Sequence, residues 1–480
     1  MAPRYNTIAV IGTGPSGIST VKALVDENTF SRIRVFERRD RVGGLWHYDP
    51  IPDVFPTPGA APDIRNEIPD SLPTFTAPVA EDKTARTGIH EALDSNVGEH
   101  AMSFTHTPFP VVNSAVSVRQ LGRNNPSRPF RVVAGYLEDL ARPYLDLISF
   151  STAVERVEKV GNKWRVTLRQ KGHYHRDQPA EYWWQEEFDA VVVASGHYNV
   201  PLIPEEIEGL DAAFKARPGS FEHSKSFRSV NDYVDKRVVV VGGNISSADL
   251  VADLHAVVKG SLYLSQRHEN ELLRNVFSLP GVENKPGVTR VDAVTDGGGG
   301  GGGVKVTFSD GSSVQDIDKV IFATGYRLVY PFLVPDPVTP SNRVAGFYQH
   351  IFKIGDPSLA LVGQVRGALS FRVYEYQAVA VARYFANTNA KPLPSPREQD
   401  QWEVERLKYK GPTALFHEIK PDFKEYFEYL REFSGPPAKG TRGYALPVFE
   451  DSLPELGFAI LQLKDKYWQK LKAGGVQAKL

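Results

Sequence analysis

Apolar runs and helical patterns alternate at two separate places in the chain. In each place a short apolar strand leads through a glycine-containing turn into an amphipathic helix and then into a second short strand. This order is typical of a βαβ unit in a parallel sheet. The predicted elements are strands at 7–11, 33–37, 237–241 and 261–265, with helices that end at about 25 and about 258.

Two further apolar runs end in a similar way. The run 190–194 stops at Ser195-Gly196, and the run 320–323 stops at Thr324-Gly325. Buried strands that end at a small residue and a glycine indicate paired exits from a parallel sheet. The fold class predicted is therefore α/β, with two Rossmann-like dinucleotide-binding domains, the smaller one inserted into the larger.

The predicted domain boundaries follow from these elements. A first domain covers 1–207, an inserted domain covers 208–325, and the chain returns to the first domain over 326–480. Helical patterns near 371–385 and 403–408 are expected to pack against the first domain.

Two segments break the pattern. Residues 50–88 are dense in proline, which removes backbone donors, and we expect a long and mobile loop without regular structure. An insertion is the favoured interpretation of it, and a catalytic lid the alternative. The glycine run 297–303 predicts a flexible hairpin connection, because glycine loses the most backbone entropy on ordering.

Composition narrows the chemistry. The chain has 480 residues, 24% of them charged, and a formal net charge of −1, so no overall field favours nucleic acid or an anionic membrane. No apolar stretch is long enough for a membrane span, and the N-terminus enters a strand pattern directly, so no signal peptide is expected. The absence of cysteine excludes disulfides, thiolate metal sites, a cysteine nucleophile and a dithiol relay.

The first turn carries a complete GxGxxG motif at 12–17. Gly12 makes the tight turn, Gly14 lets a pyrophosphate approach the backbone, and Gly17 permits close packing of helix on strand. Glu37 lies at the end of the following strand, where a carboxylate can accept hydrogen bonds from ribose hydroxyls. An acid at this place repels a 2′-phosphate, so the site is expected to hold FAD or NAD.

The second turn keeps only part of that motif. Gly242 is retained, but Asn244 and Ser247 replace the second and third glycines. Asn tolerates left-handed backbone and Ser is small, so we expect the turn to survive with a wider gap between helix and strand. Arg267 follows the next strand and can pair with a 2′-phosphate, which favours NADP over NAD.

Further motifs are spread over most of the chain, and with them it resembles the flavin-containing monooxygenases, the group B flavoprotein monooxygenases, and in particular their fungal members. The motifs are Gly43-Gly44-Leu45-Trp46, Ser95-Asn96, Met102-Ser103-Phe104, Pro108-Phe109-Pro110, Ser195-Gly196-His197-Tyr198, Phe322-Ala323-Thr324-Gly325-Tyr326 and Leu393-Pro394-Ser395.

The fingerprint of that family corresponds to residues 217–227. Arg217 stands in place of the leading aromatic residue, and His223 is expected to be a satisfied core histidine. Phe227 occupies the last position, where the related Baeyer–Villiger enzymes carry Trp, so the match favours oxygenation of a heteroatom.

The resemblance also implies the cofactor sites. Asn96 corresponds to the asparagine near flavin C4a and bound NADP, and its amide offers a donor and an acceptor. Plain loop capping is the alternative for Asn96, and core packing the alternative for Trp46. The motifs and the resemblance together predict these cofactor-binding residues: Gly12, Gly14, Pro15, Ser16, Gly17, Glu37, Arg38, Gly44, Leu45, Trp46, Val154, Gly242, Asn244, Ser246, Ser247, Arg267, Thr324 and Gly325.

The implied activity is that of an NADPH- and O2-dependent monooxygenase. NADPH reduces FAD, O2 adds at flavin C4a to give a hydroperoxide, and a thiol or thioether sulfur or an amine nitrogen attacks it. No metal is expected. The alternatives are a Baeyer–Villiger or N-hydroxylating monooxygenase and, from another class, a flavin-binding protein that no longer oxygenates.

The expected partners are a small nucleophilic substrate and O2, with no nucleic acid and no membrane span; a homodimer is left open. Cytosol is the expected location, with a peroxisomal alternative because the chain ends in Ala478-Lys479-Leu480.

Overall fold

The computed structural model describes residues 2–58, 65–80, 82, 84–294 and 302–474. The C-terminal tripeptide and residues 297–301 of the glycine run lie outside the described residues. In the part that is described, no helix is both long enough and apolar enough to cross a membrane.

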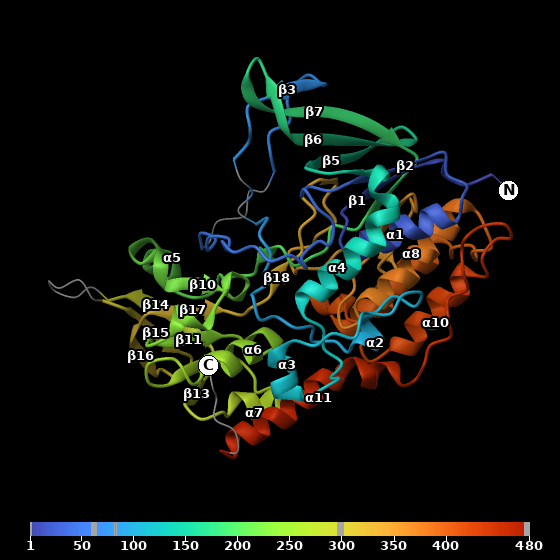
Figure 1. Cartoon of the computed structure of the whole chain (residues 1–480). Coiled ribbons are helices and arrows are strands. Elements are labelled where there is room, and N and C mark those ends of the chain that lie inside the picture. The colour runs from blue at the N-terminus through green and yellow to red at the C-terminus, as the bar shows by residue number, and fades with distance from the viewer. Residues whose placement is uncertain (1, 59–64, 81, 83, 295–301, 475–480) are drawn as a thin grey trace.

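A seven-stranded sheet forms the centre of the larger domain (Figure 1). Its five strands from β22 to β4 run parallel, and β20 and β21 extend one side as antiparallel strands. In spatial order the strands are β20 (Phe347–Tyr348), β21 (Phe352–Lys353), β22 (Leu359–Leu361), β8 (Ala190–Val193), β1 (Thr7–Ile11), β2 (Arg32–Phe36) and β4 (Ile148–Ser149).

The two faces of this sheet are buried against different partners. Ile8 and Val10 join a core with the helices α1 (Pro15–Asp26) and α8 (Phe371–Ala386). Ala9 and Ile11 point to the opposite face and join a core with a second sheet. Both faces are covered, which is why β1 reads as a continuous apolar run. The covering sheet contains β19 (Leu333–Val334), β5 (Thr152–Val160), β6 (Lys163–His175), β7 (Gln178–Phe188) and β3 (Thr74–Thr76).

The smaller domain repeats this three-layer plan around a five-stranded parallel sheet. Val238 and Val240 pack on α6 (Ile245–Leu254), and Val239 and Val241 face a three-stranded antiparallel sheet. The parallel strands are, in order, β10 (Phe221–His223), β17 (Lys319–Phe322), β11 (Val238–Val241), β12 (Leu262–Ser265) and β13 (Val282–Lys285). The covering elements are α5 (Leu210–Ala216), β14 (Val288–Ala293), β15 (Val304–Phe308) and β16 (Ser313–Ile317).

Most predicted elements are present, with small shifts at their ends. The predicted helix from 245 ends at Leu254 rather than near 258. The hairpin across the glycine run is confirmed, because β14 and β15 pair antiparallel. The prediction of paired exits from one sheet is wrong: β8 belongs to the larger domain's sheet and β17 to the smaller domain's sheet.

The two exits are nevertheless brought together by the chain that crosses between the domains. β9 (Val200–Pro201) leaves the larger domain and β18 (Tyr326–Arg327) returns to it, and the two pair antiparallel. Thr324 Oγ1 donates a hydrogen bond to Leu202 O beside this pair. The carboxyl ends of both sheets therefore meet at one place, with β18 near the centre of the molecule (Figure 1). The boundaries at 207 and 325 remain a prediction.

The C-terminal part does not pack only on the larger domain as predicted. α10 (Phe423–Ser434) lies against α8, but α11 (Leu453–Lys472) runs on to the smaller domain (Figure 1). There Trp468 and Leu471 join the core of α6, and Lys464 Nζ donates to Asp249 Oδ1 at 2.7 Å. The remaining α-helices are α2 (Glu99–Met102), α3 (Ala115–Leu121), α4 (Phe130–Ala141), α7 (Arg274–Phe277) and α9 (Pro396–Lys410).

The proline-rich segment is more ordered than its composition predicts. Its strand β3 pairs antiparallel with β7, so the expectation of no regular structure is wrong there. Proline lacks a donor, but the proline-free triplet 74–76 supplies donors for an edge strand. Phe55, nearer the start of the segment, packs against Phe214, Phe221 and Phe322 of the smaller domain at centroid distances of 5.5, 6.2 and 5.7 Å.

His197, His223, His350 and His417 are among the histidines buried in the folded protein, and burial lowers the pKa of each of these four. Burial lowers the pKa of His197 to about 4 and that of His223 to about 3. It also lowers the pKa of His350 and His417 well below the usual value, and the Nδ1 atoms of these two lie 3.1 Å apart. All four imidazoles are therefore neutral in the fold at pH 7.

We predict that the protein loses stability as the pH falls below about 6.5. The unfolded chain binds protons on these histidines that the fold excludes, so each costs about 2 kcal/mol at pH 5. Urea unfolding between pH 7.5 and 5 measures the slope. His350→Phe keeps an aromatic ring and is expected to reduce that slope by about one proton, whereas the exposed His100→Gln leaves it unchanged. A flat profile for the unmodified protein would contradict this account.

Candidate functional site

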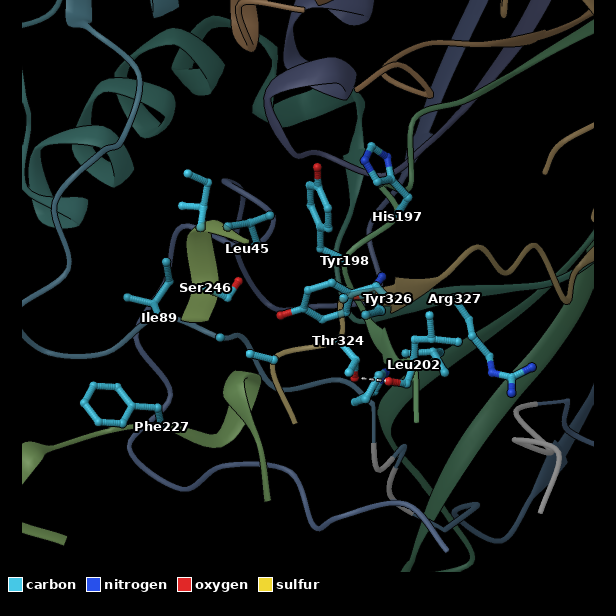
Figure 2. A pocket seen from close by; sticks show the side chains of 18 of the residues that line it. Leu45, Ile89, His197, Tyr198, Leu202, Phe227, Ser246, Thr324, Tyr326 and Arg327 are labelled. Carbon is cyan, nitrogen blue, oxygen red and sulfur yellow. Dashed lines mark hydrogen bonds between the residues drawn. The ribbon is translucent and has the colours of Figure 1, made fainter. Parts of the chain in front are cut away.

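One cavity of about 2830 Å³ lies where the carboxyl ends of the two parallel sheets meet. Figure 2 shows part of its wall, with Leu45 and Ser246 on one side and Tyr198, Tyr326 and Thr324 on the other. This is the place at which open α/β sheets bind their ligands. The predicted site residues that line it are Gly12, Gly14, Pro15, Ser16, Glu37, Arg38, Gly44, Leu45, Trp46, Asn96, Val154, Gly242, Asn244, Ser246, Arg267, Thr324 and Gly325.

Gly17 and Ser247 were predicted with this set but lie outside the cavity wall. A Cβ on Gly17 would lie 2.0 Å from Gly12 O, so Gly17 acts on the packing of α1 against the turn. Ser247 is completely buried and occupies the corresponding place in α6. Both residues set the distance between helix and strand rather than the lining of the site.

The first glycine turn leaves open space beside its backbone on the cavity wall. Gly12 has a φ of +98°, and a Cβ there would lie 2.7 Å from Ala194 O. A Cβ on Gly14 would meet only the Cα of Gly44, at 3.6 Å. The space beside Gly14 is thus left open on the cavity side, at the N-terminus of α1, where free N–H groups and the helix dipole favour an anion. The described residues fit the pyrophosphate of a dinucleotide here.

Glu37 lies at the position expected of a ribose ligand. Its Oε2 accepts hydrogen bonds from Thr13 N at 2.8 Å and Thr13 Oγ1 at 2.6 Å, and its Oε1 accepts one from Arg39 N at 2.9 Å. A carboxylate has about four acceptor positions, so Oε1 keeps one for a hydroxyl. Thr13 was not predicted from the sequence as a site residue, although its position between two glycines of the motif could have indicated such a role.

Gly44, Leu45 and Trp46 form a wall next to the first turn. Gly44 has a φ of +61°, and a Cβ there would lie 2.9 Å from Gly14 Cα, so two glycines are required for this contact. Leu45 is 37% exposed toward the cavity, and Trp46 packs edge-on against Phe371 at 6.0 Å. Trp46 therefore both lines the cavity and belongs to the core.

The second turn is built differently from the first. Gly242 has a φ of +135° and makes the turn, so the turn survives as expected, and Asn244 is extended, with a φ of −125°, so its tolerance of left-handed backbone is not used. Asn244 instead caps α6, and its Oδ1 accepts from Ile245 N at 2.9 Å. Ser247 carries a side chain at the position where Gly17 leaves no room for one, and the wider gap between α6 and its strand stays a prediction.

Arg267 follows β12 and lines the same cavity. Its side chain is 82% exposed and lies 4.0 Å from Glu206. Such an exposed ion pair contributes little stability, which leaves the guanidinium available to an anionic group. The arrangement fits a 2′-phosphate.

Asn96 lies in a short loop that is fixed from both sides. Ser95 N donates to Arg128 O at 2.8 Å, and Gly98 N donates to Gly457 O at 3.0 Å. A Cβ on Gly98 would lie 2.0 Å from Leu456 O, so α11 presses directly on this loop. Asn96 itself is exposed toward the cavity. The C-terminal helix therefore helps to fix the loop that carries Asn96.

Residues just after the two strand exits complete the wall. Tyr198 and Tyr326 lie edge to face, with ring centroids 5.4 Å apart, and burial raises the pKa of the Tyr326 hydroxyl (Figure 2). They stay protonated and can donate hydrogen bonds. Sequence reasoning did not assign them to the site, although the first residues beyond parallel strands are expected to face a ligand crevice.

His223 is the satisfied core histidine that the sequence predicted. Its Nε2 donates to Gly325 O at 3.0 Å, and its Nδ1 accepts from Lys225 N at 3.1 Å. The histidine thus ties the fingerprint segment to the returning crossing. Arg217, at the start of that segment, donates to Val294 O at 3.3 Å.

The family comparison supports the architecture described above. Residues 82–279 and 303–439 match the model of a family described as flavin-binding monooxygenase-like, and residues 10–60 match an NAD(P)-binding Rossmann-like domain. These matches cover more than half of the chain. FAD and NADPH are the cofactors that go with them.

Named relatives and solved structures agree with this match. The chain is 28% identical to the flavin-containing monooxygenase FMO GS-OX5 of Arabidopsis thaliana, over 91% of this chain and 88% of that protein. It is 28% identical to the flavin-containing monooxygenase iboF of Amanita muscaria, over 89% and 87%. The structure of S-allyl-L-cysteine S-oxygenase from Allium sativum superimposes with a TM-score of 0.70 at 24% identity, over 98% and 97%. The chain belongs to the flavin-binding monooxygenase-like family.

Proposed function

We propose that the protein is an NADPH- and O2-dependent monooxygenase that oxygenates a soft nucleophile, the sulfur of a thiol or thioether or the nitrogen of an amine. The observation that carries the proposal is the single cavity that joins both glycine turns and Asn96. When bound, FAD takes a hydride from NADPH and activates O2 for transfer to the substrate. The tasks left to the protein are to bind and orient the cofactors and the substrate and to keep water out of the cavity.

The residues of the chain divide these tasks. We assign the pyrophosphate and ribose of FAD to the first glycine turn and Glu37, with Val154 and Arg38 beside them on the cavity wall. We assign NADPH to the turn at Gly242 and to Arg267. Asn96 lines the same cavity, and we assign its amide to a polar group of either cofactor.

A panel of substrates tests the proposal as a whole. The purified protein is expected to be yellow and to consume NADPH faster with thiols, thioethers or amines, forming one oxygenated product for each NADPH. S-Allyl-L-cysteine belongs in the panel because of the similar Allium sativum structure. Conversion of cyclic ketones to lactones with no activity on sulfur or nitrogen would point to a Baeyer–Villiger enzyme. A bound flavin that NADPH fails to bleach would indicate a protein that no longer oxygenates.

Asn96→Ser is expected to uncouple the reaction. The shorter side chain loses the amide donor but keeps a polar group, so FAD content and the rate of flavin bleaching by NADPH stay close to the original. Hydrogen peroxide released per NADPH is expected to rise several-fold. Asn231→Ser makes the same chemical change on another part of the cavity wall and serves as the control. Unchanged peroxide release in Asn96→Ser would show that the role given to Asn96 is wrong.

Arg267→Ala is expected to raise the KM for NADPH at least tenfold and the KM for NADH by less than twofold, because only NADPH carries the 2′-phosphate. Steady-state kinetics with both coenzymes measures the difference. Arg290→Ala removes an exposed arginine of the same domain that lies outside the cavity wall, and both KM values should stay unchanged. Equal effects on the two coenzymes in Arg267→Ala would argue against a 2′-phosphate contact.

A further inference from the structure

Lys225 of the fingerprint segment is a buried cation directly behind the cavity wall. Its side chain is only 2% exposed, and its ammonium donates to Asp53 Oδ2 at 2.5 Å, Thr84 O at 2.9 Å and Asn199 O at 2.7 Å. All three partners line the cavity, whereas Lys225 does not. They come from the two ends of the proline-rich segment and from the crossing into the smaller domain. One ammonium group thus connects three separate segments of the chain that line the cavity.

These contacts close into a ring of hydrogen bonds. Thr84 N and Oγ1 donate to Asp82 Oδ1 at 2.8 and 2.7 Å. Arg38 donates to Asp82 Oδ2 at 2.8 Å and to Asn199 Oδ1 at 3.1 Å, and Asn199 O returns to Lys225. Arg38 directly follows the predicted ribose ligand of the first site. The ring therefore connects the first dinucleotide site with the segment that opens the smaller domain.

Arg228 fastens the same segments a second time. Its Nε donates to Asp49 O at 2.6 Å and its Nη2 to Thr87 O at 2.8 Å, so it holds both ends of the proline-rich segment. Its Nη1 donates to Lys225 O and Phe227 O, each at 2.9 Å, which fixes the loop that carries Lys225. The base of the segment is thus held by two buried cations of one short loop.

A buried ion pair is a weak source of stability. Removing an ammonium from water costs several kcal/mol, which the attraction to one carboxylate barely offsets, and apolar replacement of both partners is often neutral. What Lys225 gives instead is a fixed geometry, because a compact cation with three donors is satisfied only when all three acceptors converge. Asp53 and Asn199 are 146 positions apart, and in the described part of the chain no hydrogen bond joins them directly.

We propose that Lys225 is a positioning residue that holds the base of the proline-rich segment and the interdomain crossing together, and so keeps bulk water out of the cavity between the two dinucleotide sites. The inference rests on the proposed oxygenase function, in which water exclusion limits loss of oxygen as peroxide. The structural part of the proposal, that Lys225 holds these segments of the cavity wall together, does not depend on that function.

Hydrogen exchange of the FAD-loaded protein tests the closure directly. In Lys225→Met we expect the amides of residues 49–58 and 84–88 to exchange at least tenfold faster than in the original protein. Arg383→Met is the matched control, because Arg383 is an equally buried cation paired with Glu27, remote from the cavity wall. It should leave these amides unchanged. An equal increase in both variants, or none in Lys225→Met, overturns the proposal.

Peroxide yield tests the consequence. Lys225→Met is expected to release several-fold more hydrogen peroxide per NADPH, and Lys225→Arg, which keeps the cation, to recover most of the coupling. Asp53→Asn combined with Lys225→Met leaves no unpaired buried charge, so it serves if the single variant does not fold, and it should remain uncoupled. Coupling at the original level in that folded double variant overturns the proposal. If the unmodified protein oxygenates no compound of the panel, the proposed function fails, and the exchange experiment still decides the closure.

Discussion

The antiparallel pairing of the two interdomain crossings is the constraint on which the site depends. β9 and β18 are only two residues long, yet they place the carboxyl ends of two separate parallel sheets at one cavity. Each sheet alone presents a glycine turn and the N-terminus of a helix. Their alignment brings both glycine turns to the wall of one cavity.

The two glycine turns show how small steric differences adjust equivalent sites. In the first turn Gly17 lies so close to the backbone of Gly12 that a Cβ on Gly17 has no room. Helix α1 therefore packs directly against its turn. In the second turn Ser247 occupies the corresponding place, and its side chain is completely buried. The third motif position of the first turn therefore has no room for a side chain, whereas that of the second turn accommodates one.

Much of the local structure could be predicted from the sequence because it depends on residues that are close together in the chain. Strands buried on both faces must be continuously apolar, so β1, β8, β11 and β17 could be located from sequence. The cavity position of most predicted site residues follows from the same fact, since the residues after parallel strands face the ligand crevice. The proline-rich segment was misjudged because the pairing of β3 with β7 depends on a partner about a hundred positions away.

The sequence by itself determined the two βαβ units, the glycine turns and the charges placed after the second strands, because each requires a residue type within one turn or strand. Only the tertiary structure decided that β8 and β17 lie in different sheets, and that α11 crosses to the smaller domain. It alone placed Lys225 against wall residues from three segments. These arrangements result from contacts between groups far apart in the chain, and neither periodicity nor spacing records such contacts.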